Sequence, residues 1–233
     1  LNGDFEETGA DQVLNGDFAT DSDWTKGTGW TISGGLASCD GTQTGVTSVY
    51  QSVFQQNKNY KITFSITDIS SGGVGVVNSP KQTSIGTYTY YYYTTSADTN
   101  LYINADASFV GSIDNVSVKE VGQEWVLTDG CSITAQGARI TSDGTNQQIS
   151  QSSVLVVGDT YEMEYEITES VSGSLQLPSN FNNIILKNTV GVHKLYAVAQ
   201  NSTTLIIKRK SGVTDVTIDN IIIKRLNGDD TPR

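Results

Sequence analysis

The chain has 233 residues, a formal net charge of −11 and 36% hydrophobic residues. The negative charge repels phosphate backbones, and no basic cluster exceeds Lys208-Arg209-Lys210, which is typical of the end of a solvated strand, so nucleic acid is excluded as an expected partner. No apolar run approaches the roughly 18 residues of a membrane helix, so no membrane insertion is expected.

The chain begins with a phrase that it uses again. Leu1-Asn2-Gly3-Asp4-Phe5 is followed by Leu14-Asn15-Gly16-Asp17-Phe18, and Leu226-Asn227-Gly228-Asp229 is a third, partial copy. We interpret the phrase as the opening of a module. Residues 1–13 are then a lead segment, and residues 226–233 are a tail or the start of a truncated segment.

The clearest strand signal is an alternation with period two. Tyr60, Ile62, Phe64 and Ile66 share one face of a half-buried strand, with polar residues between them. The segment 161–167 repeats the pattern, with apolar residues inward and glutamates outward. The sequence therefore contains two copies of this strand.

Further matches extend this internal repeat. Ile113-Asp114-Asn115-Val116 returns as Ile218-Asp219-Asn220-Ile221, and a strand containing Gln51 is echoed by one containing Gln151. Elements in the same order with few insertions indicate two copies of one module. We place module 1 at residues 14–121 and module 2 at residues 122–225.

Composition and turn spacing predict the fold class. Thr, Ser, Val, Ile and Tyr dominate short runs that are separated by Gly-Gly and Asp-Gly turns, which favours antiparallel strands and almost no helix. An open sheet would leave its apolar face in water. We therefore expect an all-β protein of two tandem antiparallel β-sandwich (jelly-roll) modules, with about eight strands in each.

The ordered phrases resemble a known family. Asn15-Gly16-Asp17-Phe18, then Trp24, Gly29-Trp30, Gln51 and the closing Ile113-Asp114-Asn115-Val116 are similar to jelly-roll carbohydrate-binding modules related to families 4, 9 and 22. Similar modules occur in bacteriophage structural proteins and bacterial surface proteins. The resemblance covers most of module 1. Module 2 opens differently, with Glu124-Trp125 and no such phrase.

Sugar recognition needs flat aromatic faces and polar side chains at their rim. Our candidate glycan-binding residues all lie in module 1, because the matching strand of module 2, residues 192–198, lacks such a run of aromatic residues. The candidates are Trp24, Trp30, Tyr88, Tyr90, Tyr92 and Gln51. For the two tryptophans a core role is favoured over ligand contact.

The tyrosine run leaves alternatives open. Alternation sends Tyr88, Tyr90 and Tyr92 to one face of their strand and Tyr91 and Tyr93 to the other. One set belongs to the core. The other set contacts a glycan, contacts a neighbouring subunit, or simply faces solvent.

The resemblance also implies a structural Ca²⁺ near the chain ends, held by Asp17 and Asp114 in module 1 and by Asp219 in module 2. The acidic residue expected after the opening Phe is Ala19 in module 1, whereas the first copy of the phrase retains Glu6. The sequence therefore leaves open whether module 1 holds Ca²⁺, and favours it less in module 2. The alternative is that these aspartates accept hydrogen bonds in turns.

No catalytic set emerges. His193 is the single histidine, and Cys39 and Cys131 have no base beside them in the sequence. We expect two independent buried thiols rather than a disulfide, and no enzyme activity, with a paired-carboxylate glycosidase as the remote alternative.

These observations favour a non-catalytic protein on a virion or cell surface, hence extracellular, of the adhesion, decoration or fibre type. Its partners would be a polysaccharide or cell-surface glycan, and copies of itself in a homo-oligomer or larger assembly. The alternative is a purely structural subunit, such as a capsid decoration, tail fibre or filament, with no sugar binding.

Overall fold

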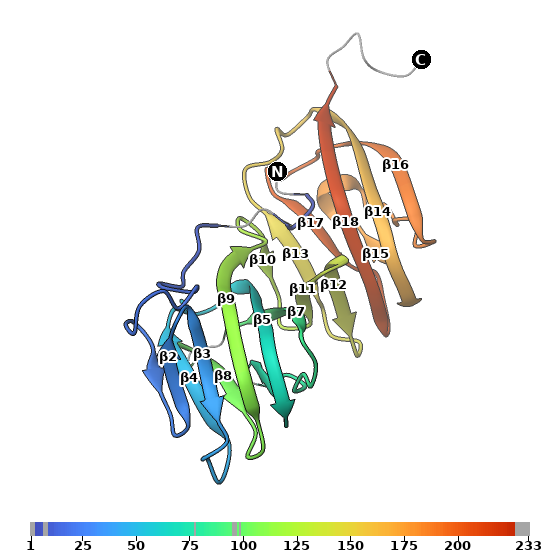
Figure 1. The fold of residues 1–233 in the computed structure, drawn as a ribbon. Helices are drawn as coiled ribbons and strands as arrows, with labels where there is room; N and C mark the ends of the chain where they lie inside the picture. Colours follow the sequence, from blue (N-terminus) through green and yellow to red (C-terminus); the bar gives the residue numbers. More distant parts are fainter. Residues whose placement is uncertain (1–2, 7–8, 77, 95–96, 98, 227–233) are drawn as a thin grey trace. The chain divides into compact units, whose positions relative to one another are not determined.

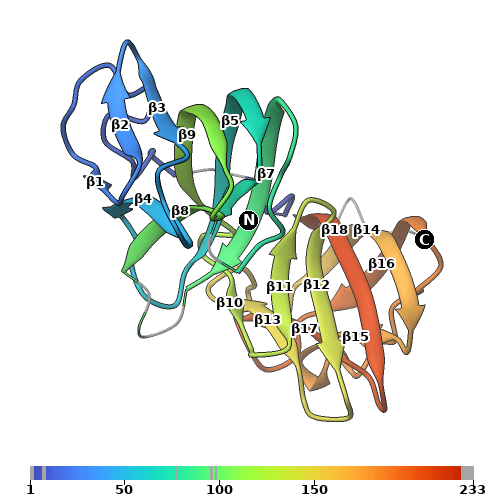
Figure 2. The ribbon, with the colours of Figure 1, turned by 60° about the horizontal axis from the view of Figure 1, so that its bottom comes forward.

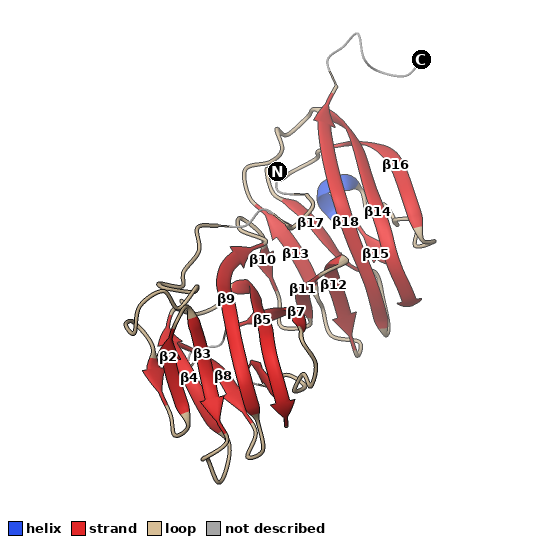
Figure 3. Ribbon diagram, in the orientation of Figure 1, coloured by secondary structure: helices blue, strands red, loops and turns tan. Residues whose placement is uncertain are grey.

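A computed structural model describes residues 3–6, 9–76, 78–94, 97 and 99–226. The regular secondary structure of the described chain is almost entirely strand, and its one helical turn is the 3₁₀ segment η1, Ser179–Phe181 (Figure 3). The predicted all-β sandwich fold is confirmed. None of the helical structure in the described residues is long and apolar enough to span a membrane.

Two compact units divide the chain (Figure 1). The first comprises residues 8–120 and is called module 1. The second comprises residues 121–233 together with residues 1–7, and is called module 2. The boundary after residue 120 lies next to the one expected, but the lead segment of residues 1–13 is divided between the two units.

Module 1 contains two antiparallel sheets. The four-stranded sheet has the order β1-β4-β8-β6, and the five-stranded sheet has the order β2-β3-β9-β5-β7. The first is built from β1 (Thr25–Lys26), β4 (Thr47–Ser52), β8 (Asn100–Ala105) and β6 (Val74–Val76). The second is built from β2 (Trp30–Ser33), β3 (Leu36–Asp40), β9 (Val110–Val121), β5 (Asn59–Ser71) and β7 (Gly86–Tyr93).

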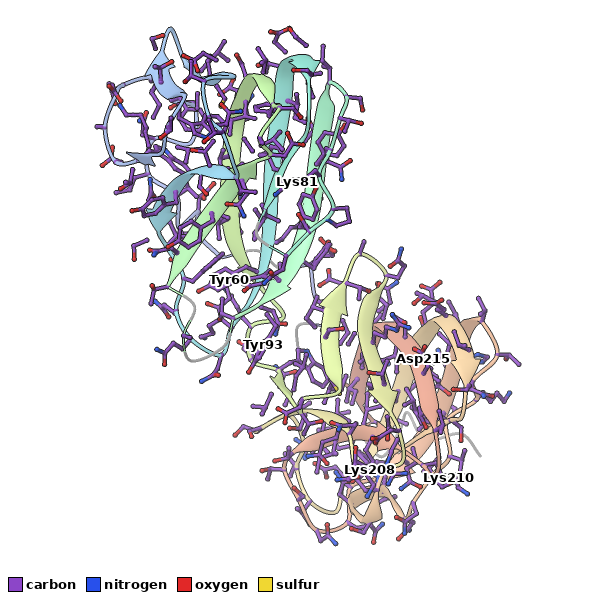
Figure 4. All side chains as sticks on the ribbon, turned by 90° about the horizontal axis from the view of Figure 1, so that it is seen from below. Tyr60, Lys81, Tyr93, Lys208, Lys210 and Asp215 are labelled. Atoms are coloured by element: carbon purple, nitrogen blue, oxygen red, sulfur yellow. The ribbon has the colours of Figure 1, made fainter. Side chains whose placement is uncertain are left out.

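The alternating strand behaves as its pattern predicts. Tyr60, Ile62, Phe64 and Ile66 on β5 are all at most 1% exposed, and they join one core cluster with the inward residues of both sheets. Figure 4 labels Tyr60, which lies within module 1. Burying one face of each sheet against the other is what the period-two pattern requires.

Module 2 repeats the same strand order. Its sheets are β10-β13-β17-β15 and β11-β12-β18-β14-β16 (Figure 2). The first is built from β10 (Val126–Leu127), β13 (Gln148–Gln151), β17 (Leu205–Arg209) and β15 (Leu175–Gln176). The second is built from β11 (Cys131–Thr134), β12 (Gly137–Ser142), β18 (Thr214–Arg225), β14 (Thr160–Ser172) and β16 (Gly191–Val198). Strand for strand this matches module 1, and the described residues of each module contain nine strands where about eight were expected.

The opening phrase explains why residues 1–7 group with module 2. In module 1, Phe18 is fully buried beside Trp24, with ring centroids 5.2 Å apart. In module 2, Phe5 is 1% exposed beside Trp125, also at 5.2 Å. Module 2 therefore has an opening phrase after all, and it comes from the N-terminus of the chain.

The rest of the lead segment belongs to module 1. The backbone N–H groups of Gly9 and Gln12 donate to the carbonyls of Glu120 and Val118 on β9, at 2.9 and 2.8 Å. Asp11 pairs with Lys119 in an isolated antiparallel bridge. Residues 9–12 thus lie along the end of β9, the last strand of module 1.

Candidate functional site

The two tryptophans of module 1 have packing roles. Trp24 is 7% exposed and Trp30 is 5% exposed. The Trp24 indole N–H donates to the Asn15 carbonyl at 3.0 Å, and the Trp30 ring lies 6.0 Å from that of Phe109. The core role favoured from the sequence is the one the structure has, so neither ring presents a free face.

Tyr88, Tyr90 and Tyr92 are the inward set of the tyrosine run. They stand opposite Phe64, Ile62 and Tyr60 of β5 and are packed, half-buried, against the core. The Tyr88 hydroxyl donates to the Ser84 carbonyl at 2.7 Å, and the Tyr90 hydroxyl accepts from the Gln82 side chain at 3.0 Å. These three rings line the inside of the sandwich rather than an open platform.

The outward set lies on an edge strand. The ammonium of Lys61 lies 5.7 Å from the centre of the Tyr91 ring, a cation–π contact. Tyr93 is 44% exposed and lies at the surface (Figure 4). One ring of the outward set is thus engaged by a lysine.

Gln51 acts as a clasp for the opening phrase. Its side-chain oxygen accepts from the Leu14 N–H at 2.9 Å, and its amide nitrogen donates to the carbonyls of Leu14 and Asp23 at 2.9 and 3.2 Å. At 8% exposure it has no free polar atom to offer at the rim of a glycan site.

The outer face of the four-stranded sheet of module 1 carries an aromatic pair that sequence reasoning missed. Tyr50 on β4 stands opposite Tyr102 on β8, and their ring centroids lie 4.8 Å apart with an interplanar angle of 34°. Their sequence neighbours Val49, Leu101 and Ile103 are fully buried, so alternation points both tyrosines away from the core.

Polar side chains flank the two rings on the same face. Ser48 donates to the Asn104 side chain at 2.6 Å, and the amide of Asn100 donates to the Tyr102 hydroxyl at 3.1 Å. Thr25 on β1 stands opposite Tyr50. We call Tyr50, Tyr102 and this polar rim the tyrosine face. Flat rings with hydroxyl and amide groups around them match what sugar recognition needs.

A lysine borders the same sheet. Lys81, which Figure 4 labels, lies beside Gly75 of β6. A Cβ built on Gly75 would lie 3.5 Å from the Cα of Lys81. Burial lowers the pKa of this ammonium, and the nearby carboxylate of Asp106 opposes that shift. Gly75 itself stands opposite Asn104 of the polar rim.

Among the described residues, the equivalent face of module 2 has no aromatic pair. The positions of Tyr50 and Tyr102 are taken by Ser150 on β13 and Ile206 on β17, which stand opposite each other. Lys208 pairs with Gln148 on the same two strands, and it belongs to the basic run at the end of β17 (Figure 4). The two modules share a scaffold but differ in this surface.

One signal in the sequence could have found the tyrosine face. Tyr50 and Tyr102 each interrupt a row of buried residues at an outward position of a short strand. Which strands become neighbours is a matter of topology, however, and β4 and β8 are far apart in sequence. The pair exists only once the register of those strands is known.

The metal-ligand candidates of module 1 accept hydrogen bonds from residues that follow them closely in the sequence. The Asp114 carboxylate accepts from the backbone and side-chain N–H groups of Asn115 at 2.6 and 3.1 Å. Asp17 accepts from the Ala19 N–H at 3.3 Å. Ala19 and Ser65 stand where module 2 has Glu6 and Glu166, so module 1 has few carboxylates here.

Asp219 in module 2 has a different environment. Its Oδ1 is buried and has no hydrogen-bond partner among the described residues. Burial raises the pKa of this carboxyl to about 6, and the negative charges of Asp4, Glu166 and Glu6 add to the rise. Of these neighbours, Asp4 belongs to the opening phrase and Glu6 directly follows it.

The carboxylates around Asp219 have the ligand chemistry that Ca²⁺ prefers, but in the described structure they are not arranged as a coordination shell. An orphaned buried carboxylate oxygen beside further carboxylates is a hard-oxygen donor set. Within the described part of the chain, no three such groups already converge on one point. Asp4 and Glu6 would have to turn toward Asp219 to complete a coordination shell.

The two cysteines and the histidine are the remaining side chains with reactive chemistry. Cys39 and Cys131 are free and buried, and desolvation raises the pKa of both thiols. A raised pKa lowers the fraction of reactive thiolate. The His193 ring makes a hydrogen bond with the Thr189 carbonyl at 2.5 Å and lies 5.5 Å from the Tyr165 ring.

No protein-family model matches the chain, and no curated protein matches it. Among solved structures, the crystal structure of the coconut allergen cocosin aligns with 99% of this chain and 89% of its own chain, at 8% identity and with a TM-score of 0.14. A TM-score this low supports no comparison of fold or function.

Proposed function

We propose that the chain is a non-catalytic protein of a cell or virion surface, and that module 1 binds a polysaccharide or cell-surface glycan through the tyrosine face. The observation that carries this proposal is the pairing of Tyr50 with Tyr102 on the outside of the sheet, among Ser and Asn side chains. The resemblance of the sequence to carbohydrate-binding modules belongs to the same proposal.

The difference between the modules supports it further. Two modules with one strand order face the same folding demands, so a partly exposed aromatic pair present in only one of them is not needed by the fold. Half-buried tyrosines of this kind are suited to contact surfaces, because the ring is apolar and the hydroxyl is polar. Weak contacts with single sugars would gain strength from many copies on one particle.

A purely structural role is the second candidate. Module 2 has no tyrosine face, and Val192, Tyr196 and Val198 on its edge strand β16 are 62%, 47% and 40% exposed. An edge strand with apolar side chains is suited to contact between subunits. A capsid decoration, tail fibre or filament would use such a surface without binding sugar.

A glycan-array screen of the purified chain tests the proposal, run with calcium and again with chelator, together with the mass of the chain in solution. Retention of specific glycans supports the binding role. A chain that retains none and forms a defined oligomer has the structural role instead.

We also propose that any structural Ca²⁺ sits in module 2 rather than module 1. Asp219, Glu166, Asp4 and Glu6 would hold it, because Asp219 offers a buried oxygen without a hydrogen-bond partner among the described residues, and the neighbouring carboxylates would add oxygen ligands and negative charge around the ion. In that position the ion would fix the opening phrase to module 2.

A further inference from the structure

The opening phrase sits on module 2 in a defined seat. The Ile221 N–H donates to the Gly3 carbonyl at 2.8 Å, and the Phe5 ring packs on Trp125. We call the surface formed by Trp125, Gln151 and residues 219–221 the phrase seat. In module 1, Val116 N–H donates to the Gly16 carbonyl at the same 2.8 Å, so both seats hold the phrase in one way.

Local backbone geometry shapes this seat. Asn220 has a φ of 48°, and Asn115 in module 1 has a φ of 52°. Asparagine tolerates this left-handed conformation better than most residues, because its short polar side chain bonds locally. The strand therefore bends just before Ile221, whose N–H is the one that bonds the phrase.

At the glycine position of the phrase, the seat has room for glycine alone. A Cβ on Gly3 would lie 1.8 Å from the Ile221 carbonyl oxygen, and one on Gly16 would lie 2.1 Å from that of Val116. Any side chain there collides with backbone that cannot move aside without breaking the strand. Recognition thus depends on the glycine of the phrase and not merely on an apolar anchor.

A buried acceptor marks the other end of the seat. In module 1 the Gln51 Oε1 accepts from the backbone N–H of Leu14, the first residue of the phrase. In module 2 the matching Gln151 Oε1 is buried without a partner among the described residues, and Leu1, the matching first residue, lies outside them. The seat therefore provides an acceptor suited to a main-chain amide.

The phrase and its seat are not neighbours in sequence. Residues 3–6 lie on module 2, but the body of module 2 begins only after residue 120. All of module 1 intervenes, and the local contacts that hold the phrase include the Ile221–Gly3 hydrogen bond, the Phe5 ring on Trp125 and close backbone packing. The N-terminal phrase of any second copy offers the same atoms.

We propose that the phrase seat is a segment-binding site that recognises Leu-Asn-Gly-Asp-Phe, and that a second copy of the chain can supply this segment in place of the chain's own. Two copies that exchange residues 1–6 would form a symmetric, closed pair. This linkage between copies stands whether or not module 1 binds glycan.

The first test uses the full chain with Gly3→Val, which should leave its own phrase unable to dock while the seat stays intact. A fluorescently labelled peptide of residues 1–7 should bind this variant, and at least tenfold less to the unchanged chain, whose seat is filled. The same peptide with Gly3→Val should bind at least a hundredfold more weakly. Gly45→Val is the matched control, because a Cβ there meets nothing within 4 Å.

Each result of this test is decisive. Failure of the peptide to bind, with module 2 folded by near-ultraviolet circular dichroism, overturns the proposal. If Gly3→Val instead unfolds module 2, the peptide should restore its unfolding transition. Absence of restoration also overturns the proposal.

The second test addresses the second copy. Unfolding the unchanged chain and refolding it at high concentration should give a dimer in light scattering that refolding at low concentration does not. Gly3→Val should give no dimer under either condition. An unchanged chain that refolds only to monomer, while the peptide does bind, shows that the seat serves one chain alone and overturns exchange between copies.

Discussion

Phe5 and Phe18 occupy the same place in the same phrase, yet they stabilise different modules. Each is essentially fully buried, and each packs at 5.2 Å on a tryptophan, Trp125 or Trp24. The sequence alone shows the phrase twice and does not show that its copies serve separate units. Docking of a segment across a hundred residues of intervening chain is a tertiary event, without a local signal.

Replacing these phenylalanines one at a time should separate the two modules. Phe5→Ala should destabilise module 2, and Phe18→Ala should destabilise module 1, each by about 3 kcal/mol, because a buried ring is lost and a cavity remains. Calorimetry of both variants measures the effects. Ile140→Ala and Ile62→Ala, in the two cores, identify which transition belongs to which module.

Matched exposed positions serve as controls. Ile85→Ala in module 1 and Val190→Ala in module 2 should change neither transition by more than about 0.5 kcal/mol, since these side chains are 64% and 67% exposed. A Phe5→Ala chain that loses stability in module 1 would contradict the assignment of the N-terminus to module 2.

Asp219 should make module 2 sensitive to pH. Its folded pKa is about 6 against an ordinary value of 3.8, so between these values the folded state holds a proton that the unfolded state has lost. Stability is therefore lost as pH rises through this window. In chelator, the melting temperature of module 2 should fall from pH 4 to pH 7, relative to an Asp219→Asn chain.

Calcium gives the second half of that experiment. Above pH 6 the ion would bind the ionised Asp219 and its neighbours, so added Ca²⁺ should raise the melting temperature of module 2 and remove its loss with pH. Asp219→Asn should abolish this effect, whereas Asp114→Asn in module 1 should not. A melting temperature of module 2 that does not change when Ca²⁺ is added at pH 7 would contradict the proposed site.

At the scale of strands, alternation predicted β5 and β14 well because one face of each is apolar and the other polar. The tyrosine run of β7 shows where that reasoning ends. Both of its faces carry the same aromatic residue, so the pattern cannot say which face is inward. Only the pairing of Tyr88 and Tyr92 with Phe64 and Tyr60 decides it.

The bend in β18 makes an element-scale prediction. Asn220 has a left-handed φ of 48°, which a β-branched residue adopts with strain. Asn220→Val should therefore cost module 2 about 1–2 kcal/mol in denaturant unfolding, while Asn220→Gly should be nearly neutral. Equal losses from both substitutions would show that the side chain of Asn220, and not its backbone conformation, stabilises the bend.

At the scale of the whole molecule, repetition in the sequence predicted two copies of one sandwich, and the strand orders of the two modules agree. The candidate site was harder to predict. Trp24, Trp30 and Gln51 carry the residue types that bind sugars, but the same types are used here to pack the core and hold the opening phrase. Tyr50 and Tyr102 become a pair only through strand register.

The central claim is that the tyrosine face of module 1 binds glycan, and titration calorimetry with the best glycan from the array tests it most directly. Tyr50→Ala and Tyr102→Ala should each weaken binding about tenfold, since a ring contact contributes about 1 kcal/mol or more. The matched control variants in module 2, Ser150→Ala and Ile206→Ala, should bind the glycan with the same affinity as the unchanged chain. Unchanged affinity in a folded chain lacking both tyrosines would contradict the account.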